Sequence, residues 1–211
     1  MVDFAVVPKR TALVNVDMQN CFVEGSPLAA PEGLAILERI NRLAVICRRS
    51  DILVIHTRSV FRSDGSNIGV LGEFDPAVRT GILNQGSPAA ALHPRLVVEA
   101  GDIILDKPRF GAFHSTDLQL ILRSRGIDTL MITGIATNVC CETTAREAAV
   151  LDFRVFFLND GTATFPIGDL SASDLQRATC ATLGLVFAQV LTVNDMIKKI
   201  ERAAQTTAAQ A

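Results

Sequence analysis

Short apolar segments alternate with amphipathic ones along almost the whole chain, and this alternation is the strongest constraint on its fold. The apolar segments predict strands at residues 11–16, 52–56, 102–106, 129–133, 153–158 and 185–190. The segments with helical periodicity lie at residues 32–49, 115–125, 140–151, 169–183 and 193–203. Strands that are apolar on both faces have to be covered on both faces. The pattern therefore predicts an α/β protein in which helices cover both sides of a parallel sheet.

The chain is expected to form a single domain that spans residues 1–211. This length is sufficient for a substantial core, and no internal repeat or linker divides it. Residues 58–100 are rich in glycine, proline, serine and asparagine, which predicts an irregular excursion with short helical pieces. Because long loops are usually functional, we interpret it as a lid on the substrate side or an interface arm. The polar segment 204–211 is expected to be a frayed tail.

Composition and charge argue against several classes of function. Hydrophobic residues make up 49% of the chain and charged residues 20%, as in ordinary globular proteins. The formal net charge is −2 and the basic residues are scattered, so no nucleic-acid partner is expected. No apolar run has membrane-spanning length, and the N-terminus lacks the pattern of a secretory signal. The five cysteines include no C-x-x-C pair. We therefore expect a cytoplasmic protein with no membrane partner.

Three chemically capable residues follow strands of the predicted sheet. Asp17 follows the first strand, Lys107 the third, and Cys140 the fourth after a short turn. Taken singly, Asp17 is a candidate turn or cap residue, Lys107 a surface lysine and Cys140 a small buried thiol. However, the carboxyl ends of parallel strands meet at one edge of the sheet, where ligands bind. Together the three residues supply a nucleophile, a carboxylate proton shuttle and a fixed cation, which favours acyl transfer by a thiol.

Cys140 also lies where a strand is expected to end and a helix to begin. The backbone N–H groups and the dipole at a helix start lower the pKa of a thiol there. The sequence therefore predicts that the pKa of Cys140 is lowered and that its thiolate is nucleophilic.

Three segments of the chain resemble the isochorismatase-like cysteine hydrolases. These segments are Val14-Asn-Val-Asp17-Met-Gln-Asn20, Asp106-Lys107-Pro-Arg-Phe-Gly-Ala-Phe113 and Gly134-Ile-Ala-Thr-Asn-Val-Cys140. The resemblance spans nearly the whole chain and implies a three-layer, Rossmann-like α/β/α fold with a six-stranded parallel sheet. It implies a catalytic triad of Asp17, Lys107 and Cys140, and a cis peptide bond between Ile135 and Ala136. The N–H groups of Ala136 and Cys140 would then form an oxyanion hole.

The same resemblance implies a reaction that needs neither a metal nor another cofactor. Asp17 would take the proton of Cys140, and the thiolate would attack an amide or ureide carbonyl to give a thioester. Ammonia would leave, and water activated by Asp17 would hydrolyse the thioester. Homo-oligomers are usual among such proteins, so we expect a dimer or a tetramer by analogy.

The chain also departs from some members of that family. His56, His93 and His114 are widely spaced, so the Asp-x-His-x-His zinc site of the nicotinamidase type is absent from the sequence. True isochorismatases lack the nucleophilic cysteine, and its presence here argues against vinyl-ether hydrolysis. Cys141 takes a position that is usually small and aliphatic, so we interpret it as a core residue. The alternative is that Cys141, and not Cys140, is the nucleophile.

The segments 122–127 and 133–140 look most like those of the ureidoacrylate and N-carbamoyl amide hydrolases, which favours a small ureide or primary amide as substrate. Side chains near the triad are candidates for substrate binding: Gln19, Asn20, Phe22, Arg58, Arg109, Phe110, Phe113 and Asn138. The three phenylalanines are equally good candidates for the core, and Arg58 for a surface ion pair. His56 is interpreted as a hydrogen-bonding residue at a strand end, not as a base.

Three other functions remain open from the sequence. One is a nicotinamidase-like amidase that works without bound metal. Another is a binding protein of the same fold that has lost the chemistry, although the intact triad argues against it. The last is a redox-active thiol protein that uses Cys140 and Cys141, which the lack of a C-x-x-C pair weakens.

Overall fold

A six-stranded parallel sheet forms the middle layer of the molecule. The structure is a computed structural model that describes residues 2–208. The strand order is β3-β2-β1-β4-β5-β6, and every neighbouring pair is parallel. The strands are β1 (Thr11–Val16), β2 (Leu53–Ser59), β3 (Ile103–Lys107), β4 (Thr129–Ile135), β5 (Arg154–Ala163) and β6 (Gln189–Leu191). The expected parallel sheet is confirmed, with its topological switch point between β1 and β4.

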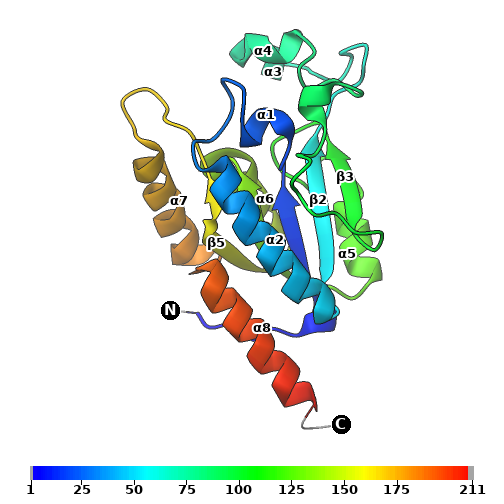
Figure 1. Cartoon of the computed structure of the whole chain (residues 1–211), viewed down its shortest axis with the longest axis vertical. Helices are drawn as coiled ribbons and strands as arrows, with labels where there is room; N and C mark the ends of the chain where they lie inside the picture. Colours follow the sequence, from blue (N-terminus) through cyan, green and yellow to red (C-terminus); the bar gives the residue numbers. More distant parts are fainter. Residues whose placement is uncertain (1, 209–211) are drawn as a thin grey trace.

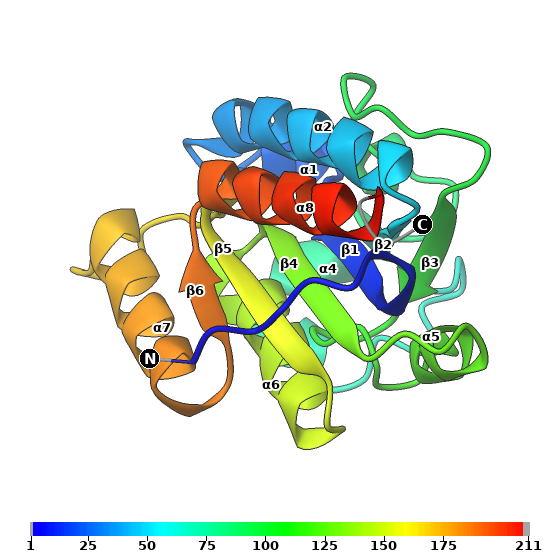
Figure 2. The ribbon, with the colours of Figure 1, turned by 90° about the horizontal axis from the view of Figure 1, so that it is seen from below.

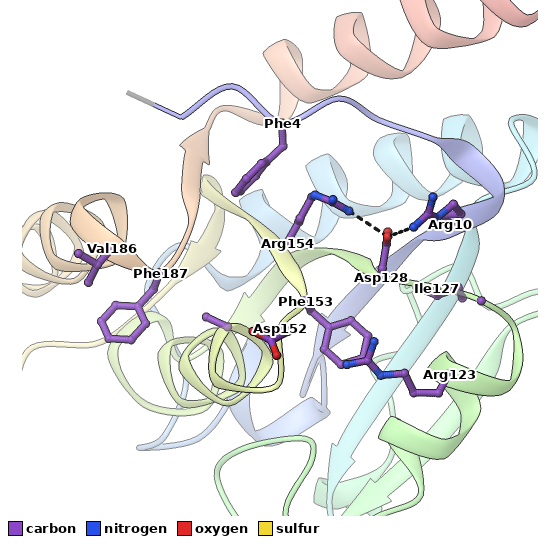
Figure 3. A pocket seen from close by; sticks show the side chains of 12 residues that line it. Phe4, Arg10, Arg123, Ile127, Asp128, Asp152, Phe153, Arg154, Val186 and Phe187 are labelled. Atoms are coloured by element: carbon purple, nitrogen blue, oxygen red, sulfur yellow. Dashed lines mark hydrogen bonds and ion pairs between the residues drawn. The ribbon is translucent and has the colours of Figure 1, made fainter.

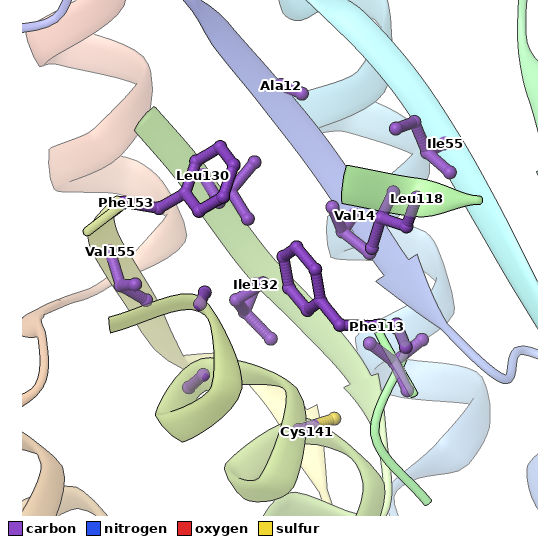
Figure 4. Close-up of a cluster of buried hydrophobic side chains, with 14 of the residues drawn as sticks. Ala12, Val14, Ile55, Phe113, Leu118, Leu130, Ile132, Cys141, Phe153 and Val155 are labelled. Atoms are coloured by element: carbon purple, nitrogen blue, oxygen red, sulfur yellow. The ribbon is translucent and has the colours of Figure 1, made fainter. Parts of the chain in front are cut away.

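Helices cover both faces of this sheet (Figures 1 and 2). One face carries α2 (Gly33–Arg49) and α8 (Val193–Ala208), and the other carries α5 (Leu118–Ser124), α6 (Glu142–Val150) and α7 (Ala172–Val186). Successive residues of β1 pack into different cores, since side chains alternate along a strand. Val14 packs on the side of α5, α6 and α7 (Figure 4), and Leu13 packs on the side of α2 and α8. The expected three-layer α/β/α architecture is therefore confirmed.

The excursion after β2 lies over the carboxyl edge of the sheet. It contains α3 (Leu71–Phe74), α4 (Pro76–Arg79) and the 3-10 turn η2 (Pro88–Ala90), and it lies beside α1 (Asn20–Val23), which follows β1 (Figure 1). A small core of its own holds it together: Cys21, Phe61, Val78 and Leu83. Because β2 continues to Ser59, the irregular part begins two residues later than the sequence indicated.

Two elements near the C-terminus differ from the sequence-based expectation. Helix α7 continues to Val186, so β6 is a short strand that begins only at Gln189. Leu185 and Val186 suggested a strand because they are apolar, yet they lie on the helix end and are 79% and 72% exposed. Helix α8 continues to Ala208, so residues 204–208 of the predicted frayed tail are helical, and 209–211 lie outside the described residues. Within residues 2–208, no helix is both long enough and apolar enough to cross a membrane.

The pairing of β1 with β4 requires a glycine at its carboxyl end. The two strands pair from Thr11 and Thr129 up to Val16 and Gly134. Gly134 has φ +120°, and a Cβ atom there would lie 2.0 Å from the backbone oxygen of Val16. Only glycine fits this close approach. Both strands therefore end side by side, and the residues after them meet at the same point.

Candidate active site

Asp17 and Lys107 form an ion pair that is closed off from solvent. Asp17 directly follows β1 and Lys107 ends β3, with β2 between these strands. Nζ of Lys107 lies 2.7 Å from Oδ2 of Asp17, and neither side chain has exposed surface. Nζ also donates a hydrogen bond of 3.0 Å to the backbone oxygen of Arg109. Charges are rarely buried in this way without a function, because their desolvation is costly.

Cys140 lies in a wide turn that follows β4. The peptide bond between Ile135 and Ala136 is cis. The next residues form a single π-helical turn, η3 (Thr137–Cys141), so α6 begins only at Glu142 and not at Cys140. The backbone oxygen of Ala136 accepts a hydrogen bond from the N–H of Cys141. This turn carries Cys140 to the carboxyl edge of the sheet, beside Asp17 and Lys107.

Burial has the largest effect on the pKa of the Cys140 thiol, and it raises that pKa. The charge of Lys107 and a hydrogen bond from the backbone of Ala136 lower it, whereas the charge of Asp17 and a hydrogen bond to its side chain raise it. Together these influences raise the pKa of Cys140 to about 12. The expectation of a lowered pKa is therefore wrong, because burial and the neighbouring carboxylate outweigh the start of the helix. At neutral pH, Cys140 is a neutral thiol next to a potential base.

Lys107 remains protonated in this setting. Burial lowers its pKa, but the charge of Asp17 and a hydrogen bond to Asp17 outweigh burial, so the pKa of Lys107 lies above its usual value. Within the described chain, Oδ2 of Asp17 pairs with this ammonium group, and no other donor lies in hydrogen-bonding geometry to that oxygen. A carboxylate oxygen has two lone pairs, so one of them is left to accept a proton from a thiol.

Two residues predicted to bind substrate instead tie the excursion to the sheet. The buried amide of Gln19 donates to the backbone oxygens of Ser59 (3.0 Å) and Ala90 (2.9 Å), and its oxygen accepts from the N–H of Ser59 at 2.7 Å. Nδ2 of Asn20 donates to the backbone oxygen of Pro88 at 2.8 Å. The polar groups of Gln19 are therefore occupied by the protein's own backbone.

The two candidate arginines also have partners within the chain. Arg58 forms a two-pronged ion pair with Asp106, with distances of 2.7 and 2.9 Å. This contact is the surface ion pair that the sequence left open as the alternative. Nη1 of Arg109 donates to the backbone oxygens of Asn67 (2.9 Å) and Pro108 (2.6 Å), so it links the excursion to the loop after β3.

The remaining substrate-binding candidates differ in burial and in the contacts that they make. Phe113 lies in the core between the sheet and α6 (Figure 4), and Phe22 packs at the border of two apolar clusters. Phe110 is 43% exposed, beyond Lys107 on the same loop. Asn138 lies in the turn of Cys140, and its side-chain oxygen accepts a hydrogen bond of 2.6 Å from Thr164. Of this set, Phe110 is exposed, and Asn138 lies in the same turn as Cys140.

The histidines lie apart from each other, each in its own surroundings. Nε2 of His56 lies 3.1 Å from Asp102, and burial lowers the pKa of this histidine, which agrees with a hydrogen-bonding role. His93 is buried against Glu24, and His114 is exposed. Among residues 2–208, no three potential metal ligands are grouped. Cys141 has no exposed surface, and its Sγ lies 3.7 Å from the backbone oxygen of Thr133, in the core between the sheet and α6 (Figure 4).

Sequence reasoning missed several residues that support the site. Thr57 in β2 donates its hydroxyl to the carboxylate described above. On α6, Thr144 and Glu147 accept hydrogen bonds from the N–H groups of Ala112 (3.2 Å) and Phe113 (3.1 Å). They thereby fix the loop after Lys107 to the helix after Cys140. Thr144 and Glu147 are three residues apart, and this spacing alone indicated that both side chains lie on one face of the helix.

A cavity of about 680 Å³ lies at the opposite edge of the sheet (Figure 3). Asp128, which precedes β4, and Arg154, which begins β5, place it at the amino ends of the strands. Arg10 and Arg154 both pair with Asp128 there. Because Cys140 lies at the carboxyl edge, this cavity has no part in its chemistry.

A buried carboxylate–ammonium pair beside a thiol, at the switch point of a parallel α/β sheet, defines a cysteine hydrolase. The model of the Isochorismatase domain family matches residues 11–195. The chain belongs to the isochorismatase family, as the sequence resemblance indicated.

Characterised relatives and a solved structure support this assignment. The chain is 33% identical to Nicotinamidase 3 of Arabidopsis thaliana, over 91% of this chain and 89% of that protein. It is 32% identical to the ureidoacrylate amidohydrolase RutB of Enterobacter sp. (strain 638), over 89% of this chain and 88% of that protein. A cysteine hydrolase from Pseudomonas syringae pv. phaseolicola 1448A superposes with a TM-score of 0.91, at 35% identity and over 96% and 97% of the two chains.

Proposed function

We propose that the protein is a cysteine amidohydrolase that cleaves a carbon–nitrogen bond of a small ureide or primary amide and releases ammonia. The observation that carries this proposal is the buried ion pair of Asp17 and Lys107 beside the neutral thiol of Cys140. The names of the relatives support a hydrolase that acts on non-peptide amides. In this proposal Asp17, Lys107 and Cys140 are the catalytic residues.

In the first half of the reaction, Asp17 takes the proton of Cys140 while sulfur attacks the substrate carbonyl. Because the resting thiol is neutral, this transfer has to accompany the attack and cannot precede it by much. The charge of Lys107 stabilises the developing thiolate. The carbonyl oxygen becomes an oxyanion that accepts hydrogen bonds from the N–H groups of Ala136 and Cys140.

In the second half, Asp17 returns the proton to the leaving nitrogen and the carbon–nitrogen bond breaks. The acyl group remains on sulfur as a thioester, and ammonia departs. Asp17 then removes a proton from a water molecule, which attacks the thioester and restores the Cys140 thiol. The net reaction consumes one water molecule and needs no other reactant.

An alternative substrate is nicotinamide or a related aromatic amide. This alternative is supported by the identity with Nicotinamidase 3, which nearly equals that with the ureidoacrylate enzyme. Both substrates carry a terminal carbonyl–nitrogen bond, so the same three residues would serve either.

Ammonia release from a panel of N-carbamoyl compounds and primary amides, including nicotinamide, tests the proposal. We expect turnover of at least one class, and a loss of at least about 10³-fold in the Cys140→Ala variant. The Cys141→Ala variant is the matched control and should remain active. Loss of activity in Cys141→Ala alone would assign the nucleophile to the other thiol. A wild-type protein that releases ammonia from nothing in the panel would contradict the proposal and favour a binding protein.

A further inference from the structure

Thr57 makes the closest hydrogen bond to the carboxylate of Asp17. Its hydroxyl donates to Oδ1 of Asp17 at 2.6 Å. The backbone N–H of Asp17 in turn lies 3.2 Å from both the hydroxyl oxygen and the carbonyl oxygen of Thr57. Neither residue has exposed surface. The two residues are thus joined in both directions, across the boundary of β1 and β2.

This contact gives the two carboxylate oxygens of Asp17 different partners. Oδ1 is bound by the neutral hydroxyl of Thr57, and Oδ2 lies 2.7 Å from the ammonium group of Lys107. A carboxylate with a partner on one oxygen only would keep more freedom to rotate about its Cβ–Cγ bond. The Thr57 hydroxyl opposes that rotation and keeps Oδ2 on the side of Lys107. The Cys140 thiol lies beside the same carboxylate.

The backbone of Asp17 also has an unusual conformation, which the contacts with Thr57 help to hold. Asp17 has φ +52°, in the left-handed region that few residues other than glycine adopt. It is the first residue after β1, so no further strand pairing holds it. Its contacts with Thr57 therefore hold both its backbone N–H and its side chain.

We propose that Thr57 is a positioning residue that orients the carboxylate of Asp17 to accept the proton of Cys140. This inference rests on the proposed function, because it assigns the proton transfer to Asp17. Thr57 touches neither the thiol nor the substrate carbonyl in this scheme, and it acts only through Asp17.

The test compares Thr57→Val, which removes the hydroxyl but keeps the shape, with Thr57→Ser, which keeps the hydroxyl. Thr129→Val is the matched control. Thr129 is also a buried strand threonine that donates its hydroxyl to an aspartate, at 2.9 Å from Asp128, but it lies at the opposite edge of the sheet. For the substrate found in the panel, kcat of Thr57→Val should fall about 10- to 100-fold, the range for a lost hydrogen bond to a charged group. The KM should change little, and Thr57→Ser and Thr129→Val should remain near wild type.

A second measurement needs no substrate. The rate of Cys140 alkylation by iodoacetamide, followed by peptide mass spectrometry, reports how readily the thiol loses its proton. It should rise in Asp17→Asn, which removes the charge that raises the pKa of Cys140. It should rise in the same direction in Thr57→Val, where the carboxylate is no longer held in place, but not in Thr57→Ser. If the wild type releases no ammonia but alkylation follows this order, the proposed function fails and the role of Thr57 stands. If Thr57→Val keeps wild-type kcat and alkylation, or if Thr57→Ser is as impaired as Thr57→Val, the inference is overturned.

Discussion

At the scale of single residues, the reactivity of Cys140 depends on its neighbours more than on its helix. Burial and the carboxylate of Asp17 keep the thiol protonated, while Lys107 and the backbone of Ala136 act in the opposite direction. Such an arrangement keeps the sulfur protonated, and therefore weakly nucleophilic, in the absence of substrate. Only 8% of Cys140 is exposed, which further limits the access of electrophiles to its sulfur.

We therefore expect no thiolate at Cys140 near neutral pH. The difference in absorbance at 240 nm between wild type and Cys140→Ala, followed as the pH rises, should show no step below the ordinary thiol pKa of 9.0. The same difference between wild type and Cys141→Ala should be equally flat, since burial raises the pKa of that thiol as well. A step below pH 9.0 in the Cys140 difference would mean that an activated thiolate exists at rest.

At the scale of secondary-structure elements, the site depends on how closely β1 approaches β4. Gly134 allows the contact, and the strands end together so that Asp17 and the turn of Cys140 become neighbours. Thr144 and Glu147 on α6 then connect this turn to the loop that follows Lys107. Three separate strands are thereby held at one edge of the sheet.

The Gly134→Ala variant should be strongly destabilised. Its methyl group would lie 2.0 Å from the backbone oxygen of Val16, and the positive φ adds strain of about 1–2 kcal/mol. With the overpacking included, we expect a loss of at least about 3 kcal/mol in the free energy of unfolding, measured by urea titration. The control is Gly101→Ala, where an added Cβ meets nothing within 4 Å and φ is not positive. Equal stability of the two variants would disprove the close approach.

The strands, and the meeting of Asp17, Lys107 and Cys140 at one edge of the sheet, were predictable from the sequence, whereas the detailed contacts were not. Apolar runs marked β1 to β5 because strands buried on both faces need continuous hydrophobicity. The same rule failed at Leu185 and Val186, which are apolar but exposed at the end of α7. Gln19 and Arg58 are predicted to lie near substrate, but the sequence does not show that their polar groups bind the protein itself. Thr57 was missed because the sequence does not reveal which neighbours face each other across two strands until their register is known.

At the scale of the whole molecule, all five cysteines share one property. Burial is the largest cause that raises the pKa of each thiol: Cys21, Cys47, Cys140, Cys141 and Cys180. An unfolded chain would ionise these thiols near their ordinary pKa of 9.0. The folded chain therefore holds more protons than the unfolded chain above that pH, and the difference favours unfolding.

Stability should accordingly fall as the pH rises above 9.0. A thiol whose pKa is raised in the folded state contributes its full stabilisation at a pH below its pKa in the unfolded chain. This contribution is lost as the pH rises toward its pKa in the folded chain. Each thiol contributes at most about 1.4 kcal/mol per pH unit. Urea unfolding at about pH 8 and pH 10 measures the loss. Circular dichroism is the suitable probe because the chain has no tryptophan or tyrosine. The loss should be smaller in Cys47→Ala, which removes one buried thiol, and an unchanged loss would contradict this explanation.

The strand order also divides the reactive residues between two halves of the chain. The half that contains β1, β2 and β3 carries Asp17 and Lys107, and the half that contains β4, β5 and β6 carries Cys140. Within the sheet, the two halves join where β1 lies beside β4. Asp17 and Lys107 precede Cys140 in the sequence, so they are synthesised before it. By the proposed mechanism, the Cys140 thiol has its base only after β1 pairs with β4, so a chain whose sheet is incomplete should lack the proposed activity.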